Sequence, residues 1–455
     1  MKFAVVGAGI TGLGAAWLLS QKHQVTLFEA EAHLGGHANT LTVEAPDGPC
    51  PIDTGFIVYN TASYPNLIAL FDRLGVRTAK SNMSFAASLA DGAYEYSGDG
   101  LSGLFGQPSN LASPAHWRMV AEIFRFFREA SAVEAKALSI DVSLRDWLAA
   151  RGYSERFVSA HITPMAAAIW STPGKNVLDF PFASFARFFE NHGLLQAFNR
   201  PEWRTVVGGS REYVSRVRAE LRGPVIAGDA VESAQSINGK VVLKSAGGRS
   251  ETFDGVLFAC HADDALRIVR SPDPAVADTL KDFRYADNLA VLHRDARHMP
   301  TRRRLWSSWN YISAARPDAV IHDAHLSVSY WMNRLQPLRT KTDYFITLNP
   351  ARAIADGAEV ARINYRHPMF DAAAMAAQVK LWPLQGRNSI WFAGSYLAYG
   401  FHEDGLQAGL AAAEDMSLRL AGELGRVMRP WPWEHSKGRI AVGPTAPSAG
   451  VRVAV

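Results

Sequence analysis

The first forty residues alternate between apolar runs and turns in the order strand, helix, strand. Residues 3–6 form an apolar run, residues 10–21 are amphipathic, and residues 25–28 form a second apolar run that ends in Glu29. Short apolar runs bounded by glycine are typical of buried strands, and helical spacing between two of them indicates a crossover helix. The pattern therefore predicts a βαβ unit at the start of the chain.

Apolar runs return much later in the chain, which predicts domains that are interleaved in sequence. Runs between residues 205 and 260 indicate strands around a helix at 211–221, and a last buried strand at 389–394 precedes an Ala-rich helix. Residues 92–200 are mostly helical and rich in aromatic side chains, whereas residues 282–375 show β-like alternation. We expect an α/β fold in which a Rossmann-like domain alternates with a mixed α+β substrate domain.

Three glycines at fixed spacing, Gly7, Gly9 and Gly12, follow the first strand. Gly7 permits the tight turn, Gly9 lets the backbone approach a pyrophosphate, and Gly12 lets helix and strand pack closely. Glu29 is placed to accept hydrogen bonds from ribose hydroxyls. The unit therefore predicts a dinucleotide at the helix N-terminus, and we expect Thr11 and Ala30 to contact it too.

A second glycine turn, at residues 34–40, comes directly behind the acid. Its glycines, Gly35 and Gly36, resemble the paired-glycine signature of the flavin amine oxidase superfamily, which includes amine oxidases, phytoene desaturases and protoporphyrinogen oxidase. An arginine usually follows the glycines in that superfamily. Here His37 takes its place, so a permanent positive charge near the pyrophosphate becomes a conditional one. The resemblance implies that the cofactor is FAD.

Composition narrows the class of protein. A chain of 455 residues is too long for a single hydrophobic core, and its length suits two domains. No stretch of about 18 apolar residues predicts a membrane span, and the immediate start of the first strand leaves no room for a signal peptide. Only Cys50 and Cys260 occur, without metal-ligand spacing, so we expect a reducing cytoplasm and no metal. The net charge of +4 suits an anionic membrane surface better than nucleic acid, for which no module is present.

The strand at 389–394 and the residues up to Gly409 resemble the closing motif of the same superfamily. In that motif the last helix directs its N-terminus at the flavin, where hydride transfer leaves negative charge that a helix N-terminus stabilises by about 0.3–2 kcal/mol. The motif holds no cysteine, so we expect noncovalent FAD. Gly405 and Leu406 are expected to supply the amides. The other contacts implied by motif and position are Thr54, Gly55, Phe56, Val231, Gly394, Ser395, Glu403 and Asp404.

A closer resemblance covers nearly the full length. The matching blocks resemble bacterial flavoproteins associated with cyclopropane-fatty-acid synthase-like methyltransferases, and the flavin domain fused ahead of plant cyclopropane synthases. The resemblance implies action on unsaturated or methyl-branched fatty acyl chains of membrane lipids, with such a methyltransferase as a partner. The blocks are 35–38, 53–60, 64–66, 83–85, 292–295, 299–300, 306–311, 347–350 and 399–405.

Two histidines are candidate catalytic residues. His402 precedes the flavin-facing helix and could act as a base at neutral pH, or could instead hydrogen-bond the turn. His293 faces the cavity if its strand alternates, or is a satisfied structural histidine. The residues 285–293 lack the lysine that amine-oxidising relatives usually carry there. We therefore expect an FAD-dependent fatty acyl desaturase; a double-bond isomerase, an amine oxidase and a noncatalytic partner of a lipid methyltransferase remain open.

The expected domain boundaries follow from these patterns. The FAD-binding domain takes residues 1–85, 203–275 and 376–425, the substrate domain takes 86–202 and 276–375, and a loosely attached tail takes 426–455. Residues 117–128 mix aromatic residues with arginines, which is typical either of a helix that lies on a membrane surface or of a two-sided core helix. We expect transient contact with the inner face of the membrane.

Overall fold

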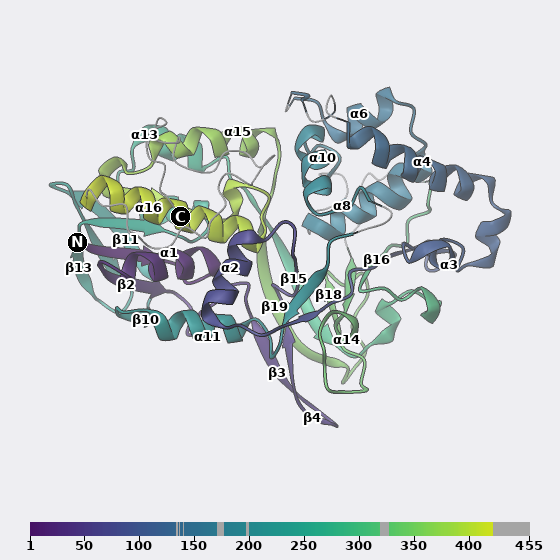
Figure 1. The fold of residues 1–455 in the computed structure, drawn as a ribbon, viewed down its shortest axis with the longest axis horizontal. Helices are drawn as coiled ribbons and strands as arrows, with labels where there is room; N and C mark the ends of the chain where they lie inside the picture. Colours follow the sequence, from purple (N-terminus) through teal and green to yellow (C-terminus); the bar gives the residue numbers. More distant parts are fainter. Residues whose placement is uncertain are drawn as a thin grey trace.

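The structure is a computed structural model that describes residues 1–132, 135, 137–139, 141–170, 177–196, 200–318 and 327–421. Figure 1 shows a lobe built around helices α1 and α16, joined by long strands to a lobe whose outer part is helical. The tail expected at 426–455, and the last residues of the expected third FAD-binding segment, 422–425, lie outside the described residues.

A parallel five-stranded sheet organises the first lobe. Its strand order is β10-β2-β1-β14-β20, and each neighbouring pair is parallel. The strands come from distant parts of the chain because helices and whole subdomains connect them. This sheet, flanked by helices, confirms the expected α/β class with a Rossmann-like domain. The strands are β1 (Lys2–Val6), β2 (Gln24–Glu29), β10 (Val225–Ala227), β14 (Gly255–Phe258) and β20 (Ile390–Phe392).

Two buried helices, α1 (Ile10–Ser20) and α16 (His402–Ala421), cross at very short distance. Glycines make this possible. A Cβ on Gly409 would lie 2.2 Å from the Thr11 carbonyl oxygen, and a Cβ on Gly405 would lie 2.8 Å from the Thr11 Oγ1 atom. The contact brings the N-termini of both helices to the side of the first lobe that faces the second lobe (Figure 1).

Smaller elements complete the first lobe. Helix α2 begins with proline at its first position and ends at Gly75, whose φ of +63° allows the left-handed cap. Strands β11, β12 and β13 form an antiparallel meander, β3 and β4 form a hairpin, and β5, β9 and β6 form a short sheet. The helices are α2 (Pro65–Leu74), α11 (Arg211–Glu220), α12 (Ala262–Ile268), α13 (Pro274–Leu280) and α15 (Ala372–Leu381). The strands are β3 (Thr40–Ala45), β4 (Gly48–Asp53), β5 (Tyr59–Asn60), β6 (Thr78–Lys80), β9 (Trp203–Val206), β11 (Val231–Ile237), β12 (Lys240–Ser245) and β13 (Ser250–Phe253).

A seven-stranded mixed sheet forms the second lobe, in the order β19-β15-β18-β17-β16-β7-β8, and helices lie beyond it (Figure 1). Its strands are β7 (Phe85–Leu89), β8 (Tyr94–Ser97), β15 (Tyr285–His293), β16 (Trp309–Ile312), β17 (Val328–Trp331), β18 (Phe345–Leu348) and β19 (Glu359–Pro368). Its helices are α3 (Gly100–Leu104), α4 (Pro114–Ala130), α6 (Leu144–Ala150), α7 (Glu155–Phe157), α8 (Thr163–Trp170), α10 (Phe182–Asn191) and α14 (Met332–Leu335), with a π-helical turn at Val158–Ile162. Within the described residues, no helix has the length and hydropathy that crossing a membrane requires.

A buried carboxylate joins the two lobes. Asp53, at the end of β4, accepts hydrogen bonds from Thr40 Oγ1 at 2.6 Å and from the Ser210 amide at 2.8 Å. Its Oδ2 accepts from Gln336 Nε2 at 2.8 Å, and its own amide donates to Gln336 Oε1 at 2.9 Å. Burial raises the pKa of Asp53 to about 6, although the hydrogen bonds oppose this rise. Both lobes are therefore fixed to one side chain.

The helix crossing predicts a difference between two glycine variants. In Gly409→Ala the new methyl group would meet a backbone oxygen, which cannot move without shifting α1. We expect a loss of about 1–3 kcal/mol in the free energy of unfolding, measured by urea denaturation. Gly14→Ala is the matched control because the atom nearest its added Cβ is the terminal Cδ1 of the Leu406 side chain, which can rotate without moving backbone. Equal stability of Gly409→Ala and the wild type would contradict the packing argument.

Candidate functional site

The first glycine turn lies between β1 and α1, at the carboxyl end of the parallel sheet. Gly7 has a φ of +102°, and a Cβ on Gly12 would lie 1.8 Å from the Gly7 carbonyl oxygen. A Cβ on Gly9, in contrast, would have no atom within 4 Å. Gly7 and Gly12 are therefore required by the turn itself, whereas Gly9 borders open space at the start of α1. The first turn of that helix carries no acidic residue, so its amides suit an anion.

Glu29 closes the other side of this turn. Its carboxylate accepts hydrogen bonds from the Ala8 amide at 2.6 Å and from the Glu31 amide at 3.0 Å. The residues after β10 run beside it, because the Gly228 amide donates to the Glu31 carbonyl at 2.8 Å. The sequence-predicted contacts Ala30 and Val231 lie next to these residues, Ala30 exposed and Val231 buried at the start of β11. Glu29 is thus held at the edge of the sheet beside the glycine turn.

The second glycine turn packs against the first. The Gly35 amide donates to the Ala8 carbonyl at 2.9 Å, and a Cβ on Gly36 would lie 3.3 Å from the Gly9 Cα. Gly35 and Gly36 have φ values of +120° and +56°, which favour glycine. The two glycine turns are separate in the sequence, and the structure brings them together at the predicted dinucleotide site, with Gly9 at their contact.

His37 leaves this turn and points toward the substrate lobe. Its ring stacks on Tyr365 of β19, with centroids 4.8 Å apart, and lies 5.3 Å from the His367 ring. Burial, together with His367, His261 and His402, holds the pKa of His37 well below its usual value. Its Nε2 is buried and has no hydrogen-bond partner among the described residues. An imidazole nitrogen without a partner, directly after the glycine turn, suits a bound ligand.

Sequence reasoning missed Tyr365 and His367. They share one face of β19 because side chains two residues apart point the same way. The Tyr365 hydroxyl is 2.8 Å from Thr54 Oγ1 and accepts a hydrogen bond from Asn39 Nδ2 at 3.1 Å. Burial lowers the pKa of His367 to about 4, and nearby His261 adds to this shift. The alternating pattern of β19 was visible in the sequence, but the strand's position opposite His37 was not.

Thr54, Gly55 and Phe56 form the floor beneath His37. The Phe56 amide donates to the His37 carbonyl at 2.7 Å, and a Cβ on Gly55 would lie 2.3 Å from the same oxygen. Gly55 therefore permits close contact between two chain segments. The three residues lie together with the second glycine turn, as their expected role in one site requires.

The N-terminus of α16 differs from the expectation. Helix α16 begins at His402, and the Gly405 amide already donates to the Phe401 carbonyl at 3.0 Å. A free Gly405 amide is therefore not available, and Gly405 and Leu406 pack against α1 instead. The helix starts three residues earlier because Asp404 accepts from the Tyr399 and Phe401 amides, at 3.2 and 3.0 Å. The backbone amides that lie nearest the N-terminal end of α16 are therefore those of the residues before Gly405.

The two acids of this turn are occupied by backbone amides. Glu403 accepts from the Asn66 amide at 2.8 Å and from the Leu67 amide at 2.9 Å, which caps the N-terminus of α2. Gly394 and Ser395 follow β20; a Cβ on Gly394 would lie 2.3 Å from the Tyr396 ring, and the Ser395 carbonyl accepts from the Gly400 amide at 3.1 Å. These contacts shape the turn between β20 and α16.

His402 lies in a closed environment. Its ring stacks on Phe56 with centroids 3.7 Å apart and planes within 9°, and its Nε2 is 2.9 Å from the Tyr213 hydroxyl. Burial lowers the pKa of His402 to about 3. A side chain with such a pKa is neutral at pH 7 and is a weak base, because general-base efficiency is greatest when the pKa lies near the working pH. These contacts favour the alternative of a histidine that holds the turn, and a catalytic role stays a prediction.

His293 is enclosed in the seven-stranded sheet. Its Nδ1 accepts from the Asp295 amide at 3.1 Å, which leaves Nε2–H to donate to Thr347 Oγ1 at 2.7 Å. Burial, with the adjacent His298, lowers the pKa of His293 to about 4. Both ring nitrogens therefore have partners, as the alternative of a satisfied structural histidine predicts.

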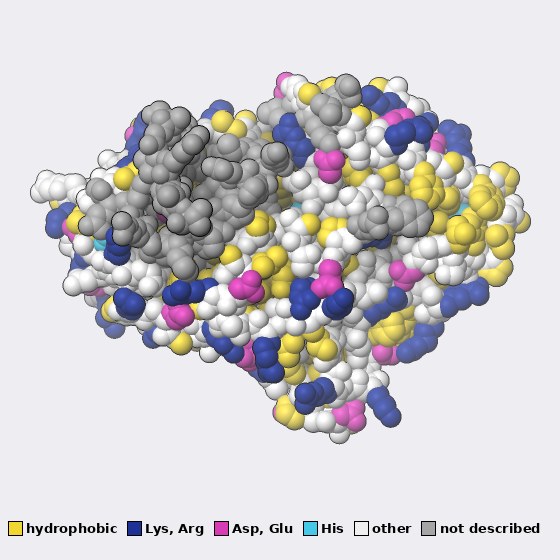
Figure 2. All heavy atoms as spheres, in the orientation of Figure 1, with side chains coloured by type: hydrophobic (Ala, Val, Ile, Leu, Met, Phe, Trp, Pro, Cys, Tyr) yellow, Lys and Arg dark blue, Asp and Glu magenta, His cyan; other side chains and the backbone are white. Residues whose placement is uncertain are grey.

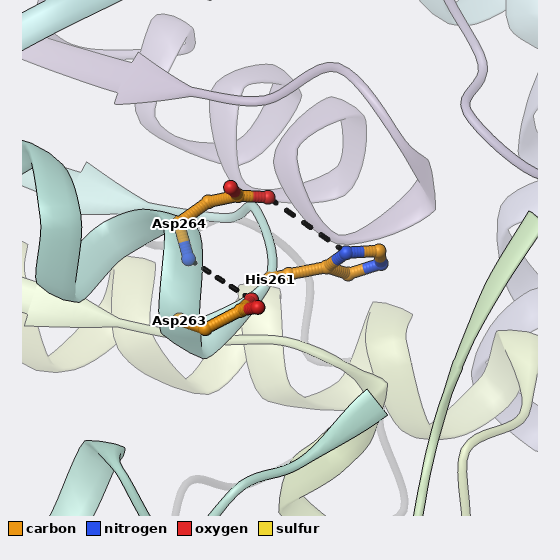
Figure 3. A group of neighbouring side chains, drawn as sticks. All are labelled: His261, Asp263 and Asp264. Atoms are coloured by element: carbon orange, nitrogen blue, oxygen red, sulfur yellow. Dashed lines mark hydrogen bonds and ion pairs between the residues drawn. The ribbon is translucent and has the colours of Figure 1, made fainter. Parts of the chain in front are cut away.

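An ion-pair cluster lies beside the site at the start of α12. Figure 3 shows His261 with Asp263 and Asp264, where His261 Nδ1 lies 3.8 Å from an Asp264 oxygen. Arg366 of β19 pairs with Asp263 and lies 3.5 Å from Asp264. Arg267 also pairs with Asp264, at 3.0 Å, so the two carboxylates are matched by two arginines. Because Arg366 comes from β19 and the acids from α12, these ion pairs connect the two lobes.

The buried histidines predict loss of stability in acid. Histidines whose folded pKa lies below the 6.5 of an exposed imidazole stabilise the fold above pH 6.5, and this contribution is lost as the pH falls toward the folded value. We expect the free energy of unfolding, measured with urea, to fall between pH 6.5 and 4. For His293 the loss is roughly 3 kcal/mol, since its pKa is about 4 and one pKa unit corresponds to about 1.4 kcal/mol. His293→Gln should flatten the pH profile, and an unchanged slope would contradict this account.

Comparisons with known proteins agree with this geometry. Residues 5–74 match the family of NAD(P)-binding Rossmann-like domains. A stretch of 42 residues, 9% of this chain, is 55% identical to 4,4′-diapophytoene desaturase (4,4′-diaponeurosporene-forming) from Staphylococcus aureus, and covers only 8% of that enzyme's length.

Solved structures match over almost the whole chain. The fatty acid isomerase from P. acnes that produces CLA has a TM-score of 0.64 at 16% identity, covering 92% of this chain and 98% of that one. Cyclohexylamine oxidase from Brevibacterium oxydans IH-35A has a TM-score of 0.63 at 16% identity, with 92% and 99% covered. The chain therefore contains an NAD(P)-binding Rossmann-like domain, and its fold is similar to that of these solved isomerase and amine oxidase structures.

Proposed function

We propose that the protein is an FAD-dependent oxidoreductase that desaturates unsaturated or methyl-branched fatty acyl chains. The observation that carries the cofactor assignment is the space around Gly9, between the two glycine turns and the start of α1. Glu29 stands at one end of this space, and the unpartnered Nε2 of His37 lies near the other turn. An NAD-binding domain does not need the second turn, whereas a longer flavin dinucleotide does.

The residues present fit FAD in two respects. The amides at the start of α1 suit the pyrophosphate, and the carboxylate of Glu29 suits the adenosine ribose. Gly35, Gly36 and His37 would border the pyrophosphate, and Thr54 to Phe56 would lie nearer the ring. Bound FAD would supply a two-electron acceptor for a hydride equivalent. Neither cysteine of the chain lies in the closing motif, which supports noncovalent binding.

Gly9→Val tests the cofactor site without disturbing the fold. The valine side chain would enter space that holds no protein atom within 4 Å of Cβ, so we expect the thermal unfolding midpoint of the apoprotein to stay within a few degrees of wild type. The same side chain would occupy the approach to the pyrophosphate, so we expect FAD affinity to fall at least 100-fold. Fluorescence titration of free FAD measures it. Undiminished affinity in a folded variant would reject this position for the dinucleotide.

The polarity of the site favours an apolar substrate. The histidines around it, His37, His367 and His402, all have pKa values lowered by burial and are neutral at pH 7. A cationic amine would gain little there, because recognition of a cation calls for a carboxylate or an open aromatic face. Phe56 is already stacked on His402. The site therefore offers a dry environment with few fixed charges.

An apolar cavity adjoins the turn that leads into α16. Its volume is about 190 Å³, enough for a short stretch of acyl chain. Phe370 separates it from the turn, because a Cβ on Gly400 would lie 3.0 Å from the Phe370 ring. The walls are mostly apolar, and a paired arginine and aspartate are among the lining residues: Trp170, Val177, Asp179, Phe180, Arg284, Met369, Phe370 and Asp371. The apolar lining of this cavity supports a substrate with an acyl chain, and Phe370 would lie between that chain and the turn.

The proposed reaction removes two hydrogens from neighbouring carbons. A hydride leaves a carbon beside an existing double bond or a methyl branch, where the developing positive charge is stabilised, and a proton leaves the next carbon to form the new double bond. The protein contributes orientation and exclusion of water. In this scheme His402 orients Phe56 and Tyr213 and does not take the proton. Both hydrogens would pass to bound FAD, one as hydride and one as a proton, so that substrate and cofactor balance.

The decisive experiment mixes the FAD-loaded protein with lipid in the absence of oxygen. We expect stoichiometric loss of the absorption band near 450 nm with phospholipid or free fatty acid that carries a double bond or a methyl branch, and no loss with the saturated straight chain. Mass spectrometry should find a product two mass units lighter. His402→Gln should slow bleaching by less than tenfold; a loss of 100-fold or more would restore His402 as the base.

The same experiment separates the other functions. An unchanged mass with a shifted double bond would assign an isomerase, the reaction named for the P. acnes structural neighbour. Bleaching by polyamines or benzylamine alone would assign an amine oxidase. No change with any lipid or amine would favour a noncatalytic partner of a lipid methyltransferase, and co-purification with such an enzyme would then be the measurement. Met369→Trp, which narrows the cavity, should slow bleaching by lipid but leave FAD affinity unchanged.

A further inference from the structure

The outer surface of α4 carries apolar side chains where a solvent-facing helix normally carries polar ones. Trp117 is 48% exposed and Phe124 is 53% exposed, and Ala121 lies between them on the same face. The opposite face of the helix is buried, with Met119, Ile123 and Phe126 in the core. Helix α4 is therefore apolar on both sides, and only one side is covered by the protein.

The exposed apolar surface continues into the segment before α4. Leu101 of α3 is 74% exposed, and Leu111 of the 3₁₀ turn at Pro108–Ala112 is 56% exposed. Among the described residues, nine large hydrophobic side chains are exposed, and four of them fall between positions 101 and 124. Figure 2 shows hydrophobic side chains gathered at the end of the molecule where Figure 1 draws α3 and α4. We call this the α3–α4 face.

Hydrogen bonds and a ring contact hold the segments of the α3–α4 face together. Trp117 Nε1 donates to the Leu111 carbonyl at 2.9 Å, and the Trp117 ring lies 4.5 Å from the Phe105 ring. Ser113 caps α4 by accepting from the His116 amide. The exposed side chains are therefore presented by a fixed scaffold.

The acids of this segment are either buried or paired with arginines. From Asp99 to Ala130 the charged side chains are Arg118, Arg125, Arg128 and three acids, Asp99, Glu122 and Glu129. Asp99 pairs with Arg334 at 2.9 Å, and Glu129 lies 3.6 Å from Arg125 and 3.7 Å from Arg151. Glu122 is 4% exposed and accepts hydrogen bonds from Ser154, so it presents no charge to solvent. The surface thus combines apolar side chains with the exposed Arg118 and Arg128, and its partly exposed carboxylates are paired with arginines. This combination is typical of a surface that enters the headgroup region of an anionic bilayer.

We propose that the α3–α4 face docks on a bilayer that contains anionic phospholipid. The apolar side chains would enter the boundary between headgroups and acyl chains, and the arginines would pair with phosphates. A symmetric dimer through this face would bring arginines of one copy against those of the other, which is unfavourable. Docking does not depend on the proposed reaction, because it needs no bound cofactor.

The test is co-sedimentation of the FAD-loaded protein with vesicles. One set contains phosphatidylcholine alone, and the other contains phosphatidylglycerol at 30%. We expect at least tenfold tighter binding to the second set, weakened by salt. Leu101→Ser with Phe124→Ser should reduce binding to both sets at least tenfold. Arg118→Gln with Arg128→Gln should remove about fivefold per arginine from binding to the anionic set only.

The control changes the same residue types elsewhere on the surface. Val379→Ser with Arg218→Gln alters one exposed hydrophobic residue, 61% exposed, and one exposed arginine of α11 in the first lobe. It should bind vesicles like the wild type, and all variants should retain FAD. Failure of the wild type to sediment, or equal binding by the Leu101/Phe124 variant and the control, would overturn the proposal. A dimer in analytical ultracentrifugation that the Leu101/Phe124 variant abolishes would assign the face to a second copy instead.

Discussion

The close crossing of α1 and α16 fixes the position of everything else in the site. Two glycines of α16 allow this crossing. Gly405 faces the side chain of Thr11 in α1, and Gly409 faces the backbone of the same residue. The turn before α1 carries the first glycine motif, and the turn before α16 carries His402. A crossing one side chain wider would separate these two turns. The packing of two helices therefore decides the geometry of a site to which neither helix contributes many side chains.

The second constraint on the site is that its buried histidines are uncharged. The imidazoles around the site are kept neutral by desolvation, and the acids of the first turn of α16 are occupied by backbone amides. The positive end of α16 is partly balanced by these carboxylates, whereas the first turn of α1 has none. The two helix ends thus offer different potentials, and the stronger anion site belongs to α1.

The local sequence pattern was enough to predict the strands, the glycine turns and the fold class, because each of these depends on a few neighbouring residues. The bonding of the Gly405 amide within α16 could not be predicted from pattern, because the start of α16 depends on Asp404 and its contacts with Tyr399 and Phe401. The contact of Gly405 with the cofactor stays a prediction. The pairing of Glu403 with the α2 amides joins positions more than 300 residues apart, and Tyr365 reaches His37 over a similar separation. No periodicity encodes such contacts. They arise only when distant segments of the chain come together in the folded protein.

The strand order of the central sheet has a consequence for how the chain is made. Phe3 of β1 lies opposite Gly255 of β14, and the edge strand β20 begins only at Ile390. The first strand leaves the ribosome long before the partner on one of its sides exists. Non-local pairing of this kind slows folding and leaves apolar edges open in the meantime. Chaperone demand during synthesis is thus built into the interleaved topology, and truncation anywhere before β20 would leave the central sheet with an uncovered edge.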